Sequence, residues 1–211
     1  MSDDAKTDQY ARQAAGWSDA AYADGDAYLA HRAALVASLG VGLARGDEVL
    51  DLACGDGGLG EHLLARGLRY TGVDSERAMV AAARERLAGR ARVELGDLNT
   101  FEPDRPVAAT TVFRAIYYTD DRAAFFRRAA TFTERKLVFD LNPRQYRVDD
   151  VLDELTTAGF GRVELRPFFV PQTKRLPPTA IGVLQALERS GPLARAALRV
   201  RFTYLVGAVR G

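Results

Sequence analysis

Residues 49–60 of the chain read Val49-Leu50-Asp51-Leu52-Ala53-Cys54-Gly55-Asp56-Gly57-Gly58-Leu59-Gly60. The stretch begins as an apolar run, reaches an acid, and then becomes rich in glycine. Gly55, Gly57 and Gly60 have the G-x-G-x-x-G spacing, in which missing side chains allow a tight turn, close approach of the backbone to a ligand, and close packing of a helix on a strand. We therefore expect a strand, a glycine-rich turn and a helix in this order.

A second acid, Asp74, follows the glycine-rich stretch at a spacing that is typical of nucleotide-binding sites. Residues 69–73 are typical of a strand, and this strand ends at Asp74. An acid about 20 residues beyond the first glycine is placed to reach the ribose hydroxyls of a bound nucleotide. The glycine turn and this acid together predict a site for a cofactor that contains a nucleoside.

Charge narrows the choice of cofactor. Three acids, Asp51, Asp56 and Asp74, surround the start of the expected helix, where a dinucleotide would place its pyrophosphate. Like charges about 4 Å apart cost roughly 4 kcal/mol near a protein surface. The acids therefore disfavour phosphate and favour a cation such as S-adenosylmethionine, which carries a sulfonium and an ammonium group.

The same residues resemble the motifs of the class I S-adenosylmethionine-dependent methyltransferases. Asp51, Gly55 and Gly57 fit the first motif, written acid-x-G-x-G-x-G, although Ala53 stands where a leading glycine is often found. Asp74 resembles the ribose-binding acid of the family, and Gly96-Asp97-Leu98 resembles its adenine-binding segment. The resemblance covers residues 45–165 and says nothing about the substrate.

The resemblance implies an α/β fold, the three-layer α/β/α Rossmann-like class I methyltransferase fold. Its seven-stranded, mostly parallel sheet has the order 3-2-1-4-5-7-6 and an antiparallel last strand. We expect strands at 49–51, 69–73, 91–95, 107–113, 136–141, 162–170 and 201–209. Residues 1–211 then form a single S-adenosylmethionine-binding domain, with an N-terminal helical cap over 1–40 and a helical insertion over 171–199 that acts as a lid, a dimer face or a packing layer.

The expected cofactor contacts come from these motifs and from neighbouring loops. Met79 lies against the adenine ring or fills core space. Arg32 falls on the apolar stripe of a helix, where it contacts the methionine carboxylate or an active-site acid, or extends along the sheet edge. Gly57 is expected to be glycine because the cofactor approaches its backbone. The full set is Arg32, Asp51, Ala53, Gly55, Asp56, Gly57, Asp74, Ser75, Met79, Asp97, Leu98 and Arg114.

Candidate catalytic residues are few. Tyr117 and Tyr118 follow the fourth strand on the ligand side of the sheet, and at most one of them is expected to face the acceptor. His31 serves as a general base only if its helix carries it inward. Without a base, the enzyme works by approximation, which removes roughly 7 to 11 kcal/mol of barrier.

The composition argues against several other classes of protein. The chain has 211 residues, 47% of them hydrophobic, and a net charge of +1, which favours one full-sized core and argues against nucleic acid as a partner. One cysteine, no leader-like start and no long apolar run indicate a cytoplasmic protein without a membrane segment. No metal-ligand cluster stands out, and either a monomer or a homodimer is expected.

The sequence thus predicts methyl transfer from S-adenosylmethionine to an oxygen, nitrogen or sulfur atom of a small or medium organic molecule. Two alternatives keep the cofactor site. In one, the scaffold promotes a reaction other than methylation; in the other, the chain is a non-catalytic cofactor-binding subunit. A dinucleotide oxidoreductase is disfavoured by Asp51.

Overall fold

The computed structural model describes residues 21–199 and 203–211. The strands are β1 (Glu48–Leu52), β2 (Arg69–Asp74), β3 (Arg92–Leu95), β4 (Val107–Val112), β5 (Thr133–Leu141), β6 (Phe160–Pro167) and β7 (Tyr204–Arg210). The helices are α3 (Gly25–Ser38), α4 (Gly58–Ala65), α5 (Arg77–Leu87), the 3₁₀ turn η2 (Ile116–Tyr118), α6 (Arg122–Phe132), α7 (Val148–Thr157), α8 (Pro178–Glu188) and α9 (Pro192–Leu198).

Seven strands of the described residues form one sheet with the order β3-β2-β1-β4-β5-β7-β6. Strands β1 to β5 pair in parallel, whereas β7 runs antiparallel to both β5 and β6. All six residues of β4 are buried, as expected for a parallel strand that is covered on both faces. The predicted fold class and strand order are confirmed.

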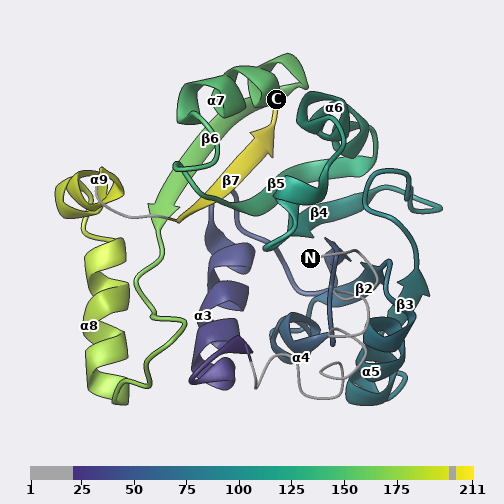
Figure 1. Ribbon diagram of the computed structural model, residues 1–211, viewed down its shortest axis with the longest axis horizontal. Coiled ribbons are helices and arrows are strands. Elements are labelled where there is room, and N and C mark those ends of the chain that lie inside the picture. The colour runs from purple at the N-terminus through teal and green to yellow at the C-terminus, as the bar shows by residue number, and fades with distance from the viewer. Residues whose placement is uncertain (1–20, 200–202) are drawn as a thin grey trace, which may run out of the picture.

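Helices cover both faces of the sheet (Figure 1). Neighbouring residues of β1 serve opposite faces, because side chains alternate along a strand. Val49 joins a core cluster with Leu35, Leu63 and other residues of α3, α4 and α5, while Leu50 joins Phe126 and other residues of α6 and α7. The result is the predicted three-layer arrangement.

Gly60 shows why α4 lies so close to the sheet. A β-carbon at this position would lie 2.7 Å from the Tyr70 ring of β2, well inside the normal contact distance. The third glycine of the motif therefore permits close packing of a helix on a strand.

Side chains fix the starts of two helices. Asp24 accepts a hydrogen bond from the backbone N–H of Ala27 at the start of α3, and Asp121 accepts one from Ala124 at the start of α6. Both are N-caps, in which an acid satisfies an otherwise unpaired helix donor. Of the predicted helical cap over 1–40, residues 1–20 lie outside the described residues.

The C-terminal part departs from the expected boundaries in detail. Helices α8 and α9 occupy most of the predicted insertion, separated at Gly191. Strand β6 ends at Pro167, whereas the prediction carried it to Val170. Phe168 instead packs edge-on against Tyr28 of α3, with ring centroids 4.9 Å apart. The chain thus leaves the sheet at this point, before α8 begins at Pro178.

Within the described ranges, every helix is too short or too polar to cross a lipid bilayer.

Candidate active site

A cavity of about 440 Å³ lies at the carboxyl ends of β1, β2 and β4. Ligands of open parallel sheets bind at this edge. Thirteen of the sequence-predicted site residues line it: Arg32, Asp51, Ala53, Gly55, Asp56, Asp74, Ser75, Met79, Asp97, Leu98, Arg114, Tyr117 and Tyr118. Gly57 and His31 do not.

Asp74 is held in place by the glycine turn. One carboxylate oxygen accepts the backbone N–H of Gly55 at 2.8 Å, and the other accepts that of Glu76 at 2.9 Å. Burial raises the pKa of Asp74, while these backbone hydrogen bonds oppose the shift. Each oxygen keeps a further lone pair for a ligand hydroxyl.

Asp51 is buried at the end of β1. The hydroxyl of Tyr70 donates to it at 2.8 Å and that of Thr111 at 2.7 Å. Burial raises its pKa to about 6 despite these bonds. A cation beside Asp51 would favour the ionised form, so this position suits the ammonium group of an amino-acid moiety.

Asp56 does not add to the negative field as the sequence suggested. Its carboxylate lies 2.8 Å from the Arg86 guanidinium of α5 and also accepts the backbone N–H of Gly58. The arginine neutralises it, so of the three acids singled out in the sequence, Asp51 and Asp74 are the two without an arginine in an ion pair among the described residues.

The role predicted for Gly57 is wrong. Its backbone has φ of +75°, and a β-carbon there would meet Ala83 of α5 at 3.1 Å and Leu87 at 3.2 Å. Glycine is thus required by the left-handed turn and by the approach of α5, and not by the cofactor.

Gly57→Ala tests this new role. The variant is expected to lower the free energy of unfolding by about 1 to 3 kcal/mol, because the methyl group meets α5 in a strained backbone. Urea unfolding measures the loss. Gly89→Ala is a matched control, since Gly89 has φ of +74° with open space around it; an equal loss in both variants would leave only backbone strain and contradict the packing role.

Arg32 is buried on the cavity side of α3. Its guanidinium donates to the hydroxyl of Tyr28 at 2.9 Å, lies 3.5 Å from the carboxylate of Asp140, and sits 4.3 Å from the ring centroid of Phe113. Its Nε is buried and has no hydrogen-bond partner in the described part of the chain. Of the alternatives for Arg32, the path along the sheet edge is wrong, because this side chain points inward at an acid.

Arg114 follows β4 in a left-handed conformation with φ of +55°. Its backbone N–H donates to Asp140 at 2.7 Å, so Asp140 connects both arginines. Backbone strain of this kind persists where surrounding contacts impose it, often at functional sites.

Tyr117 and Tyr118 lie in η2 at the cavity rim, 44% and 48% exposed. Their ring centroids are 4.4 Å apart, and both line the cavity. The tight turn of η2 brings the two rings together at this cavity, and the expectation that at most one of them faces the acceptor stays a prediction.

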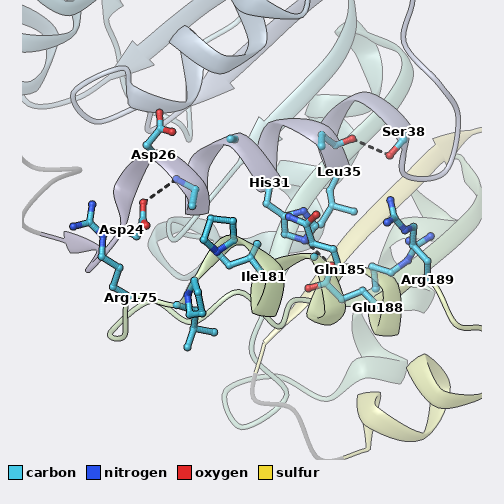
Figure 2. A pocket seen from close by; sticks show the side chains of 18 of the residues that line it. Asp24, Asp26, His31, Leu35, Ser38, Arg175, Ile181, Gln185, Glu188 and Arg189 are labelled. Carbon is cyan, nitrogen blue, oxygen red and sulfur yellow. Dashed lines mark hydrogen bonds and ion pairs between the residues drawn. The ribbon is translucent and has the colours of Figure 1, made fainter.

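His31 faces away from this cavity, into a groove between α3 and α8 (Figure 2). Neighbouring residues on a helix point about 100° apart, so Arg32 reaches the cofactor cavity and His31 does not. His31 Nε2 lies 2.5 Å from Glu188 of α8, and both side chains are buried. The proposal that His31 is a general base is therefore contradicted.

Sequence reasoning missed several lining residues. Asn99 follows the adenine-like segment and connects two loops, donating to the carbonyl of Tyr118 and accepting from the N–H of Asp120. Leu29 and Phe113 add apolar surface. The end of β4 was the available signal for Phe113, and no pattern marked Asn99.

Residues 49–136 match a family model described as a methyltransferase domain. Over this stretch the chain is similar to methyltransferase domains. It has no significant match among curated proteins.

Solved methyltransferases share the fold. The TehB-like methyltransferase of Corynebacterium glutamicum is 16% identical, with a TM-score of 0.65 over 99% of this chain and 100% of that one. The magnesium protoporphyrin IX methyltransferase of Synechocystis with bound S-adenosylmethionine is 18% identical, with a TM-score of 0.61 over 88% and 79%. The glycopeptide N-methyltransferase MtfA, also with S-adenosylmethionine, is 18% identical, with a TM-score of 0.62 over 86% and 87%.

Proposed function

We propose that the methyltransferase domain transfers a methyl group from S-adenosylmethionine to an oxygen, nitrogen or sulfur atom of a small or medium organic molecule. One observation carries this proposal. A single cavity joins Asp74 of β2, Asp51 of β1 and the inward-facing Arg32 of α3 to the aromatic rim that follows β4. It thus offers groups for the ribose and for the charged amino-acid part of the cofactor beside a place for an acceptor.

Each part of the cofactor has a matching group. Asp74 accepts the ribose hydroxyls, Asp51 faces the ammonium, and the unpaired Nε of Arg32 faces the carboxylate. Met79 and Leu98 flank the adenine ring. Bound in this way, the cofactor supplies an electrophilic methyl group, and the chain contributes binding and orientation.

Catalysis in this proposal rests on approximation. Among the residues described, neither histidine lines the cavity, and a tyrosine with a pKa near 10 is a poor base at neutral pH. The residues therefore hold a nucleophile that is already neutral or easily deprotonated, in line with the bond that breaks. The alternatives, a non-methylating enzyme and a non-catalytic subunit, predict cofactor binding without methylated product.

The test is production of S-adenosylhomocysteine. The purified chain is incubated with S-adenosylmethionine and pooled small acceptors, and S-adenosylhomocysteine and methylated products are measured together by mass spectrometry. Methylated product above the level found with the Asp74→Ala variant supports the proposal. Tight binding of S-adenosylhomocysteine with no methylated product from any pool favours the alternatives.

The tyrosine rim gives a prediction about the acceptor. Replacing both Tyr117 and Tyr118 by alanine is expected to lower kcat/KM for the acceptor at least about 100-fold, because ring contacts and hydroxyl hydrogen bonds position the nucleophile. The double phenylalanine variant keeps the rings and should lose about tenfold or less. Affinity for S-adenosylhomocysteine should change little in either variant, and full activity of the alanine variant would place the acceptor elsewhere.

Asp51 gives a prediction about pH. Its pKa of about 6 in the free protein should fall when the ammonium binds, so cofactor binding near pH 6 releases a proton. The affinity for the cofactor should therefore fall by up to about tenfold for each pH unit below 6. Since the folded pKa is raised, Asp51 also lowers the stability of the free protein as pH rises from about 4 to 6. Calorimetry in buffers of different ionisation enthalpy measures the proton release, and Asp51→Asn should abolish it; an unchanged release would contradict the contact.

A further inference from the structure

A second cavity adjoins the cofactor cavity. Its volume is about 330 Å³, and it shares Arg114 and Tyr117 with the first. The rest of its wall comes from η2, from the end of β5, from the segments that follow β5 and β6, and from Tyr28 of α3 and Thr203. It lies next to the aromatic rim and has a volume within the range of small-molecule sites.

The wall of this second cavity combines apolar and amide groups. Ile116, Phe168 and Val170 provide the apolar surface, and Asn142, Gln145 and Gln172 provide amides. This mixture suits a compact organic molecule with a polar end.

The one carboxylate among the described lining residues of the second cavity already has partners. Arg114 and Asp140 are its charged lining residues among those described. Asp140 already lies 3.5 Å from the guanidinium of Arg32 and accepts the backbone N–H of Arg114 at 2.7 Å. The carboxylate of Asp140 is therefore already paired, and the guanidinium of Arg114 is the charged group of this wall that is placed to bind a ligand.

Arg114 carries the unused binding capacity. Its Nη1 is buried and has no hydrogen-bond partner in the part of the chain that is described. A buried unpaired donor is costly unless a ligand completes it. Arg114 lines both cavities, so it lies at the wall between them.

We propose that the second cavity holds the methyl acceptor and that this acceptor carries a carboxylate, which binds the guanidinium of Arg114. The planar guanidinium matches a carboxylate in a bidentate hydrogen bond. Arg114, at first assigned to the cofactor, is thus a specificity-determining residue for the acceptor, while Arg32 keeps the cofactor role. This inference rests on the proposed function.

Matched probes test the charge preference. Two series keep one skeleton and change only the charged end: 4-hydroxybenzoate, 4-hydroxybenzamide and 4-hydroxybenzylamine, and glycolate, glycolamide and ethanolamine. Binding of each probe to the chain saturated with S-adenosylhomocysteine is measured by calorimetry. In at least one series, the carboxylate is expected to bind at least about tenfold more tightly than the amide and the amine. If the carboxylate is not preferred in either series, the inference is overturned. A preference for the amine would indicate that Asp140, and not Arg114, binds the charged end of the acceptor.

Variants of Arg114 test whether this residue causes the preference for the carboxylate. Arg114→Met is expected to remove the preference for the carboxylate and to leave the affinity for S-adenosylhomocysteine within about threefold, and Arg114→Lys should keep part of the preference. Arg147→Met, an exposed arginine outside both cavities, is the matched control and should change nothing. If Arg114→Met keeps the preference, or mainly weakens S-adenosylhomocysteine binding, Arg114 does not select the acceptor. The preference for the carboxylate is measured first on the unchanged chain, so that measurement does not depend on how the variants fold. Failure of the unchanged chain to bind S-adenosylhomocysteine would instead count against the proposed function.

Discussion

Asp74→Ala is expected to weaken binding of S-adenosylhomocysteine by at least about 100-fold. Two ribose hydroxyls donate to one carboxylate in the proposed complex, and each charge-assisted hydrogen bond contributes about 1.5 to 3 kcal/mol. The sum of about 3 to 6 kcal/mol corresponds to a loss of two to four orders of magnitude in affinity. Calorimetric titration with S-adenosylhomocysteine measures it.

The structure adds a second effect to this variant. Asp74 also accepts the N–H groups of Gly55 and Glu76, so alanine leaves both backbone donors without their side-chain partner. Thermal unfolding must therefore accompany the titration, and Asp74→Asn, which retains one acceptor oxygen, should bind with intermediate affinity. Asp104→Ala, at an exposed acid paired with Arg92, is the matched control. Affinity of the alanine variant within about threefold of the unchanged chain would reject Asp74 as the ribose ligand.

Glu188→Ala is expected to lower the free energy of unfolding by about 3 kcal/mol or more. Glu188 is only 1% exposed; one carboxylate oxygen lies 2.5 Å from His31 of α3 and the other accepts the backbone N–H of Phe169. Removing one partner of a buried pair leaves the other unsatisfied, which costs about 3 to 5 kcal/mol. Glu188 thus joins α8, α3 and the segment after β6.

Urea unfolding measures this loss, and the dependence of the unfolding free energy on urea concentration is compared between variants. Asp153→Ala, at an exposed acid of α7, is the control and should change stability by about 0.5 kcal/mol or less. Because His31 and Glu188 do not line the cofactor cavity, affinity for S-adenosylhomocysteine should be retained. A loss of affinity for S-adenosylhomocysteine with unchanged stability would contradict the structural role and indicate that His31 belongs to the active site.

The fold was predictable because its signals are local. The apolar run before Asp51 and the glycines after it specify a strand, a turn and a helix within twelve residues, 49–60. Asp74 follows from the same spacing rule. Most of the expected cofactor residues line the cavity for this reason, since the carboxyl ends of parallel strands meet at one edge.

Other parts of the site depend on partners that are distant in sequence. Glu188, the partner of His31, is 157 residues away, and Arg86, which neutralises Asp56, is 30 residues away. A single sequence has no signal for such pairs. The direction of His31 likewise depends on which face of α3 the sheet and α8 cover.

Asp140 escaped notice for a different reason. It stands inside the apolar run of the fifth strand, where the pattern indicates burial and gives no reason to single out a polar residue. Its importance comes from its two arginine partners, Arg32 and Arg114, which are separated in sequence by most of the parallel sheet. Only the folded chain brings these three residues together.

Ala53 stands where a glycine is often found in the first motif, and yet its backbone keeps the left-handed conformation, with φ of +62°. An L-residue with a β-carbon pays about 1 to 2 kcal/mol for that conformation, so the contacts around the turn must enforce it. In this chain the turn is therefore defined by its backbone path, and a search that requires glycine at position 53 would miss it although the path is present.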